Sequence, residues 1–370
     1  MIGQHVPSAD LDRCLNLIHR RAGCRLCANA CPVDAISLEH PAPILDTETC
    51  VACGVCIAVC PTDVFGEGDH TERTLLRSVS QHAPDELGVV CVRRTNPRKA
   101  PLPTAIVVTH PRCLGSLDIG DLLELSDQGN RPIVLDDTLC EECPIGSAHT
   151  VIATAVDSVN ALLGNPQAIR VASDATETAA VREVIDGAHP HFTRRALFGL
   201  VRDRAAELTD RDPGGSLPTS RVRLLAHLPT IDEMGTTRIP FADVRIDPDA
   251  CTACRACVQF CPTDALTMST KDATFAISFR PAACLDCGIC AVACPESAVS
   301  FGDRIEGLLN ARTLAAGPLT ACESCNTPTA AKVGADGRTL CTWCRHGAGA
   351  VGPLHDEAGL VEDLLGRLDD

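Results

Sequence analysis

Short apolar runs alternate with helical patterns between residues 85 and 190. Four runs rich in β-branched residues are typical of buried parallel strands: residues 87–92 (LGVVCV), 104–110 (TAIVVTH), 132–137 (PIVLDD) and 168–173 (AIRVAS). The spacing of apolar positions predicts helices over 118–129, 146–164 and 175–188. Alternation of strands and helices favours a parallel sheet, so we predict a small α/β domain over 85–190.

A short repeat predicts further strands on both sides of this domain. Each copy begins with Cys-Pro and leads into a short apolar strand: residues 31–37 (CPVDAIS), 60–65 (CPTDVF), 261–267 (CPTDALT) and 294–300 (CPESAVS). The copies form two pairs, which predicts two related modules, over 1–70 and 241–305.

The remaining segments are predicted from local composition. Residues 191–240 are expected to form a connector, with an Arg-rich helix followed by the loop-like DPGGSLPTS. Residues 318–350 contain two cysteine pairs, and a terminal helix is predicted within 351–370. The predicted fold class is therefore α+β and multi-domain.

Composition shows that rings contribute little to compaction. The 370 residues include 24 Cys but only 8 Phe, 1 Trp and no Tyr. The cysteines fall in groups of eight, four, eight and four, with none between residues 144 and 250. We therefore expect the cysteines to help hold the chain together.

The formal net charge of −16 argues against a nucleic-acid partner, which would need clustered Lys and Arg. It favours protein partners with basic docking surfaces. We find no apolar run of the 18–20 residues that a membrane span needs. The start MIGQHVPSADLDR lacks the layout of a signal peptide. A cytoplasmic location is expected, where disulfides are rare.

The spacing of the cysteines in residues 251–294 predicts two [4Fe–4S] clusters. The pattern C-x2-C-x2-C-x3-C-P occurs twice, and the fourth cysteine of each run ligates the cluster of the other run. Zinc is the alternative, but it usually takes two CxxC pairs. The predicted ligands are Cys251, Cys254, Cys257 and Cys294 for one cluster, and Cys284, Cys287, Cys290 and Cys261 for the other.

With all eight ligands and both prolines in place, residues 243–302 resemble a bacterial ferredoxin with two [4Fe–4S] clusters. The resemblance implies a β–α–β pseudo-twofold fold and one-electron transfer. Two such modules in one chain are similar to a polyferredoxin-type electron-transfer subunit.

The N-terminal module resembles the same family, with one departure. Arg21 stands where the first cysteine of the first run belongs. We expect Cys14, ten residues before Cys24, to replace it. The alternatives are a [3Fe–4S] cluster or a ligand other than cysteine. The expected ligand sets are Cys14, Cys24, Cys27 and Cys60, and Cys31, Cys50, Cys53 and Cys56.

Four cysteines of the middle domain lie at or just past the ends of predicted strands: Cys91, Cys113, Cys140 and Cys143. Ligands gather outside the carboxyl ends of strands in open parallel sheets. We expect a metal site here, with a fifth [4Fe–4S] cluster preferred over zinc. The alternative is four buried thiols that act as small apolar residues. For His110 and His149, which lie nearby, we expect ordinary polar roles.

The tail carries two CxxC pairs separated by fifteen residues, which is the spacing of a structural zinc ribbon. The pairs are Cys322 with Cys325, and Cys341 with Cys344. We expect a zinc ion, or a single iron as its main rival, with a hairpin between the two pairs.

The sequence shows little substrate chemistry. We find no dinucleotide turn, phosphate loop or serine elbow. Acidic pairs such as Asp136/Asp137 are expected to be solvated turns. We predict an electron-transfer protein that serves a partner oxidoreductase through four or five clusters. The alternatives are an assembly factor for a metalloenzyme, and an enzyme that acts on a small molecule at the middle site.

Overall fold

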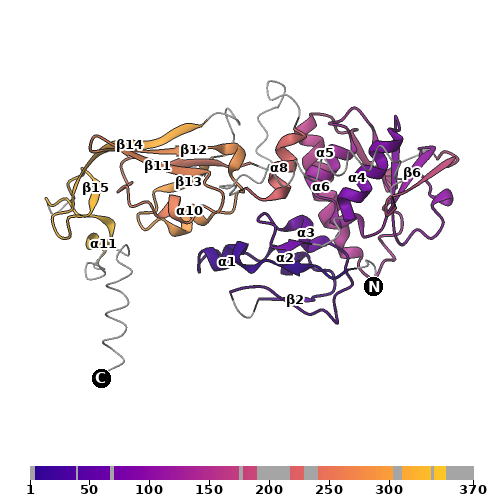
Figure 1. The fold of residues 1–370 in the computed structure, drawn as a ribbon, viewed down its shortest axis with the longest axis horizontal. Coiled ribbons are helices and arrows are strands. Elements are labelled where there is room, and N and C mark those ends of the chain that lie inside the picture. The colour runs from indigo at the N-terminus through magenta and orange to yellow at the C-terminus, as the bar shows by residue number, and fades with distance from the viewer. Residues whose placement is uncertain are drawn as a thin grey trace, which may run out of the picture.

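The computed structural model describes residues 5–38, 41–66, 71–174, 178–189, 217–228, 241–302, 311–334 and 337–346. Figure 1 shows an elongated arrangement of helices and sheets. A parallel sheet and its helices form one end, the C-terminal strands form the other, and the N-terminal segment runs below the junction.

The middle unit contains a five-stranded parallel sheet in the order β8-β7-β5-β6-β9. Four of these strands lie within the predicted apolar runs. In chain order they are β5 (Leu87–Cys91), β6 (Ile106–His110), β7 (Ile133–Leu135) and β8 (Ile169–Val171). The accompanying helices are α4 (Thr71–His82), α5 (Ile119–Leu125) and α6 (His149–Leu163).

The two faces of this sheet bury different partners because side chains alternate along each strand. Val89 and Val108 pack with α4, α5 and α6 in the largest aliphatic core. Val90 and Val107 face the opposite side, where Leu102 of a connecting loop covers them. The chain segments that step along the sheet toward β8 run across one of its faces, and the segments that step toward β9 run across the other face. Right-handed crossovers require this arrangement. The order in which the chain adds strands to the sheet reverses between β5 and β7. Ligands bind at this switch point in such sheets.

One predicted helix of this unit is wrong. Within residues 175–188 the structure has a strand, β9 (Glu183–Asp186), which pairs with β6 in parallel. Val184 and Ile185 alternate between the two cores, and Ile185 is buried. Burial on both faces of the sheet therefore outweighs the helical spacing of the sequence.

Helix α4, which precedes residue 85, also packs in the middle unit. Leu75, Leu76 and Val79 are buried in the same core as the sheet. The hydrophobic pattern predicts no helix before residue 85, so the packed unit is larger than the sequence indicates.

The N-terminal module is built from short elements around its cysteines. Strand β1 pairs with β4, and β2 pairs with β3, both antiparallel. The elements are β1 (Ser8–Ala9), α1 (Leu15–Ile18), α2 (Leu26–Ala30), β2 (Ile36–Ser37), β3 (Ile44–Leu45), α3 (Val55–Val59) and β4 (Phe65–Gly66).

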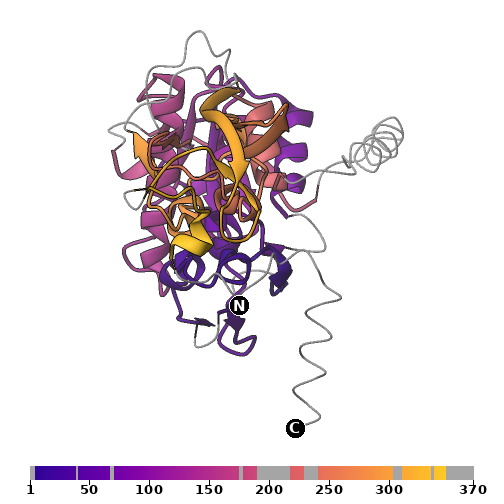
Figure 2. The same ribbon diagram turned by 90° about the vertical axis from the view of Figure 1, so that its left-hand side faces the viewer.

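The second cysteine-rich module has the same plan with longer strands. Strand β10 pairs with β13, and a second sheet has the order β11-β12-β14-β15. Figure 2 views this sheet from the C-terminal end of the molecule. The elements are β10 (Asp243–Ile246), α9 (Ala256–Gln259), β11 (Leu266–Lys271), β12 (Thr274–Phe279), α10 (Ile289–Ala293), β13 (Val299–Gly302), β14 (Arg312–Ala321), β15 (Pro328–Ala330) and α11 (Thr342–Arg345).

The tail has a hairpin around its first CxxC pair, and between the two pairs the Gly334 N–H donates to the Arg338 carbonyl. Strand β15 pairs backward with β14, so the hairpin encloses Cys322 and Cys325. Strand β14 extends the sheet of β11 and β12, which gives β15 an edge on which to add. The predicted helix within 351–370 and the Arg-rich helix of the connector lie outside the described residues.

The described part of the connector forms helix α8 (Thr219–Ala226), which contacts all three units. Ser220 donates a hydrogen bond of 2.6 Å to Asp63 of the N-terminal module. Arg223 makes ion pairs of 2.7 Å with both Asp118 and Asp121 of α5. Arg221 lies over the ring of Phe241, just before β10. Helix α8 therefore holds the three units together.

We predict that Arg223→Leu lowers the free energy of unfolding by about 3 kcal/mol, because it leaves two largely buried carboxylates without their cation. Urea unfolding followed by circular dichroism measures this change. The control is Arg13→Leu, which removes an exposed pair with Asp10 and should cost less than about 1 kcal/mol. Equal losses in the two variants would contradict the prediction.

Candidate cluster and metal sites

Twenty cysteines gather into five groups of four, which we call sites 1 to 5. Within each group the thiols line one cavity or lie close enough to shift one another's pKa. Site 1 contains Cys14, Cys24, Cys27 and Cys60; site 2 contains Cys31, Cys50, Cys53 and Cys56; site 3 contains Cys91, Cys113, Cys140 and Cys143; site 4 contains Cys251, Cys254, Cys257 and Cys294; and site 5 contains Cys261, Cys284, Cys287 and Cys290.

The four Cys-Pro repeats share one turn that aims the last cysteine of each run. The third residue after that cysteine is left-handed in every copy, with φ between 50° and 53° at Asp34, Asp63, Asp264 and Ser297. In three copies the next residue donates its backbone N–H to the cysteine sulfur, at 3.2–3.3 Å. Such amide–sulfur bonds help to set the potential of a bound cluster.

The structure brings Cys14 into site 1 and turns Arg21 away from it. Cys14 is the N-cap of α1, is 7% exposed, and lines the same cavity as Cys24 and Cys60. The guanidinium of Arg21 instead donates a hydrogen bond of 2.7 Å to the carbonyl of Val292. The turn before Cys24 survives the loss of a cysteine because Gly23 adopts a φ of 63°.

Asn16 is a positioning residue that the sequence analysis missed. Its side-chain amide donates to the carbonyl of Cys24, and its oxygen accepts from the Cys24 N–H, at 2.9 and 2.8 Å. These two bonds fasten α1, and with it Cys14, to the first cysteine run. Its spacing of two residues after Cys14 carries no signal that sequence reasoning could have used.

Burial keeps the thiols of these sites protonated in the absence of a cation. It raises the pKa of Cys27 to about 11 and that of Cys257 to about 12, and neighbouring thiolates add to each rise. Only the thiolate binds a metal, so these sites need a positively charged group to release their protons.

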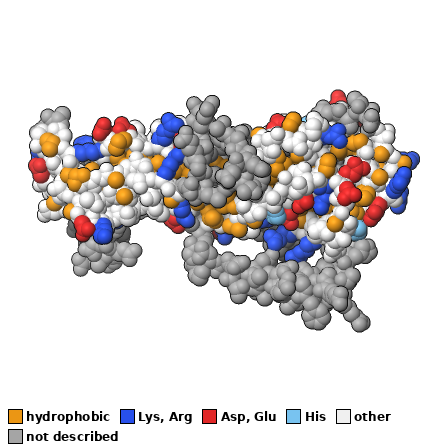
Figure 3. Space-filling view, turned by 90° about the horizontal axis from the view of Figure 1, so that it is seen from above, with side chains coloured by type: hydrophobic (Ala, Val, Ile, Leu, Met, Phe, Trp, Pro, Cys, Tyr) orange, Lys and Arg blue, Asp and Glu red, His pale blue; other side chains and the backbone are white. Residues whose placement is uncertain are grey.

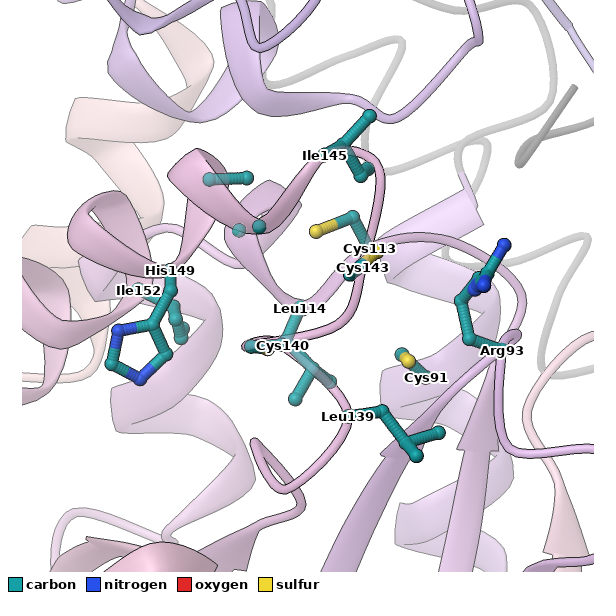
Figure 4. A pocket seen from close by; sticks show the side chains of 13 residues that line it. Cys91, Arg93, Cys113, Leu114, Leu139, Cys140, Cys143, Ile145, His149 and Ile152 are labelled. Carbon is teal, nitrogen blue, oxygen red and sulfur yellow. The ribbon is translucent and has the colours of Figure 1, made fainter.

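Site 3 forms at the carboxyl edge of the parallel sheet, at the switch point between β5 and β7. Cys91 ends β5, Cys113 follows β6, and Cys140 and Cys143 follow β7. Figure 4 shows the four side chains around one hollow with Leu114 and Ile145. Burial raises the pKa of Cys113 to about 12 and that of Cys140 to about 11.

The hollows at sites 1, 3 and 4 are similar in size. The hollow at site 3, which is open to solvent, contains about 430 Å³ of empty space, compared with about 350 Å³ at site 1 and about 320 Å³ at site 4. Because sites 1 and 4 belong to the ferredoxin-like modules, the similar size at site 3 favours a cluster there.

The two histidines near site 3 have polar partners in the protein. His110 is fully buried and its Nε2 lies 2.8 Å from Ser116 Oγ. Burial lowers the pKa of His110 to about 3, so the ring is neutral. Nε2 of His149 lies 3.1 Å from Asp137 Oδ2.

The expectation that Asp136 and Asp137 are solvated is wrong. Both residues are buried, at 2% and 7% exposed. Asp136 accepts two bonds from Arg94, and Asp137 accepts two from Ser173. Their position at the end of a buried strand requires these partners.

The four tail cysteines form a much tighter group, which we call site 6. Cys322, Cys325, Cys341 and Cys344 have sulfur atoms that all lie within 4.8 Å of one another. Around a tetrahedral zinc ion with Zn–S distances of about 2.3 Å, sulfur atoms lie about 3.8 Å apart. The Cys325 and Cys341 sulfurs are 3.6 Å apart, so site 6 fits one metal ion.

One thiol of site 6 ionises more readily than a free cysteine, which favours the binding of a cation. Burial opposes ionisation of Cys322, but the amides of Cys341, Ser324 and Cys325 outweigh it and lower the pKa to about 6. The Cys341 N–H lies 3.2 Å from the Cys322 sulfur. His346 faces Glu296 at 3.5 Å.

Residues 20–64 and 250–298 each match the 4Fe-4S dicluster domain family. The chain is also 51% identical over 43 residues to an uncharacterised ferredoxin of Methanocaldococcus jannaschii. It is 44% identical over 39 residues to one subunit of an ion-translocating oxidoreductase complex of Methanosarcina acetivorans. The matches cover 10% of this chain each, and 28% and 15% of the two relatives. The two modules are therefore ferredoxin-type dicluster domains, and the matches extend no further.

We predict that Cys14→Ala removes or converts the cluster of site 1, because the site then keeps three thiols. Iron and sulfide content should fall by up to about four atoms each per chain, or a three-iron signal should appear in paramagnetic resonance spectra. The control is Leu17→Ala on the same helix. Leu17 is exposed, so this variant should change neither the iron and sulfide content nor the spectrum. Full content and an unchanged spectrum in Cys14→Ala would exclude Cys14 as a ligand.

We predict that Cys341→Ser removes about one metal ion per chain and leaves the iron–sulfur absorbance intact, since site 6 fits a single ion. Elemental analysis and visible spectra of the same sample measure both quantities. A loss of iron–sulfur absorbance in this variant would contradict the assignment of site 6.

Proposed function

We propose that this iron–sulfur, ferredoxin-like electron carrier relays single electrons along five [4Fe–4S] sites in the order 4-5-1-2-3. The cysteines named above would be the ligands, and the clusters would supply one-electron redox chemistry. The observation that carries the proposal is that packing contacts join all five sites without a break.

The first link lies within each dicluster module. Cys257 of site 4 and Cys290 of site 5 are buried in the same apolar cluster. In the same way, Cys27 of site 1 packs against the apolar cluster that contains Cys56 of site 2. The crossed ligation of the repeats explains this closeness, because each run contributes one cysteine to the neighbouring site.

The second link joins the two modules, between sites 5 and 1. Leu15 of α1 packs against Ile289 of α10, in a cluster that also includes Cys24 and Cys287. The rings of His19 and Phe260 meet edge to face, with centroids 4.7 Å apart. The bond from Arg21 to Val292 closes this junction. The departure from the cysteine pattern at Arg21 thus serves the contact between modules.

The third link joins site 2 to site 3. Cys53 and Val55 of the N-terminal module pack with Ile145 and Ala148 of the middle unit. Cys113 and Cys143 border the same cluster, and Cys53 acts on the pKa of Cys113. Site 3 is therefore one end of the path.

Four cysteines at site 3 favour a relay over catalysis at this position. A catalytic metal keeps a coordination position open, whereas a full set of thiolates leaves none on a cluster. Site 6 has a structural role, with zinc preferred over a single iron. The Ala330 N–H and the Thr329 hydroxyl both donate to the Thr252 carbonyl, which fixes the tail beside site 4.

The partner is proposed to be another protein of an oxidoreductase complex. One relative is named as part of such a complex. The net charge of −16 favours a basic docking surface on the partner, although acidic and basic side chains intermingle on the face in Figure 3. No helix in the described ranges combines the length and apolarity that crossing a bilayer needs.

We predict that the reconstituted chain binds about 20 iron atoms, four at each of five sites, and is reduced by dithionite. Anaerobic iron analysis and paramagnetic resonance check this. The oxidoreductase captured by a tagged chain from its own cell extract should then accept electrons from the reduced chain. A chain that holds only zinc, or a partner that binds but is never reduced, would refute the proposal.

The path is tested at the junction of sites 5 and 1. Leu15→Asp should slow electron delivery to that oxidoreductase per loaded chain, because it separates α1 from α10. Leu15 also borders site 1, so the rates are compared at equal iron content. Leu17→Asp places the same charge on the exposed side of α1 and is the matched control. Equal rates in the two variants would show that electrons do not cross this junction.

A further inference from the structure

Arg112 and Arg221 differ from the other basic residues in their burial. Among the described arginines and lysines, these two alone are buried, at 1% and 7% exposed. A buried cation is costly unless negative charge lies close to it. Each of the two lies beside a different dicluster module.

Arg112 packs against the cysteine run of site 2. A Cβ built on Gly54, between Cys53 and Cys56, would lie 3.1 Å from its Nη1 and 3.3 Å from its Cδ. Burial lowers the pKa of Arg112 to about 10, while thiolates at Cys56, Cys53 and Cys50 act to raise it. Glu72 lies 3.7 Å from Nη1 but also accepts a bond from Ser116. The cation therefore faces the ligands of site 2.

Arg221 lies beside the second dicluster module. Its guanidinium carbon lies 4.9 Å from the centroid of the Phe241 ring, which covers it. Burial lowers its pKa to about 10, and Cys284 is the first of the negative groups that raise it, followed by Asp286. Leu217, just before α8, packs against the apolar cluster that contains Cys290 of site 5, which brings the start of this helix to the second module.

The other sites have weaker cations nearby. At site 4, Lys332 donates a bond to the Cys251 carbonyl, but it is partly exposed and so is screened by water. At site 3, Arg93 lines the cavity but is exposed, and Arg94 is held by the buried carboxylate of Asp136. Within the described part of the chain, no cation is among the groups that act on Cys24 or Cys27 of site 1.

We propose that Arg112 and Arg221 are potential-setting residues, which make sites 2 and 5 easier to reduce than sites 1 and 4. This inference rests on the proposed function, because it needs clusters at these sites. Reduction adds one negative charge, and a buried cation stabilises that charge in a medium of low polarity. Along the path 4-5-1-2-3, an electron then rests at site 5, next to the junction between modules, and at site 2, next to site 3.

The test is a redox titration of the full, cluster-loaded chain followed by paramagnetic resonance. Arg112→Leu should shift the reduction equilibrium of one signal about tenfold toward the oxidised form, which is about 59 mV for one electron. Arg221→Leu should shift a different signal in the same direction. Arg112→Lys and Arg221→Lys, which retain the charge, should restore most of each potential. Arg112→Gln serves the same measurement if Arg112→Leu does not fold.

Arg131→Leu is the control, because Arg131 is half-buried in the middle unit and donates its hydrogen bonds to the carbonyls of Pro84 and Leu125, away from the cysteine sites. It should leave every potential unchanged. Unshifted signals in the Arg112 and Arg221 variants, or equal shifts in all three, would overturn the inference. A wild-type chain without reducible signals would instead refute the proposed function.

Discussion

The convergence of cysteine sulfurs from distant segments is the constraint on which the rest of this structure depends. Each of the four dicluster sites takes three thiols, or two and Cys14, from one stretch and a last thiol from a repeat 19 to 37 residues away. Buried thiols stay protonated until a cation is bound, so the packing of these modules and the occupation of their sites are coupled. The repeated left-handed turn after each Cys-Pro makes this convergence possible.

The units of the chain are held together in different ways. The middle unit buries a regular aliphatic core between its sheet and three helices. The dicluster modules instead mix cysteines into small apolar clusters, such as the one formed by Cys14, Ile36, Cys56, Val64 and Phe65. The scarcity of aromatic residues is therefore met by aliphatic packing in one unit and by sulfur-rich packing in the others.

The arrangement of the units gives the sites their order. Helix α8 contacts Asp63 of the first module, the acidic end of α5 and Phe241 of the second module. The same helix carries Arg221 toward site 5 and Arg223 to α5. It therefore contributes both to the contacts between units and to the charge near one site. Contacts that hold the modules in place are also the contacts that bring neighbouring sites together.

The sequence by itself determined the features that depend on local spacing. The cysteine runs, the Cys-Pro turns, four strands of the parallel sheet and the two tail pairs all follow from residues within about ten positions of one another. Only the tertiary structure decided which thiol lies beside Cys24, that residues 183–186 form a strand, that Arg21 serves the junction between modules, and that two arginines are buried beside cysteine runs. These outcomes depend on which surfaces meet in space, because burial and charge are set by neighbours that lie far away along the chain.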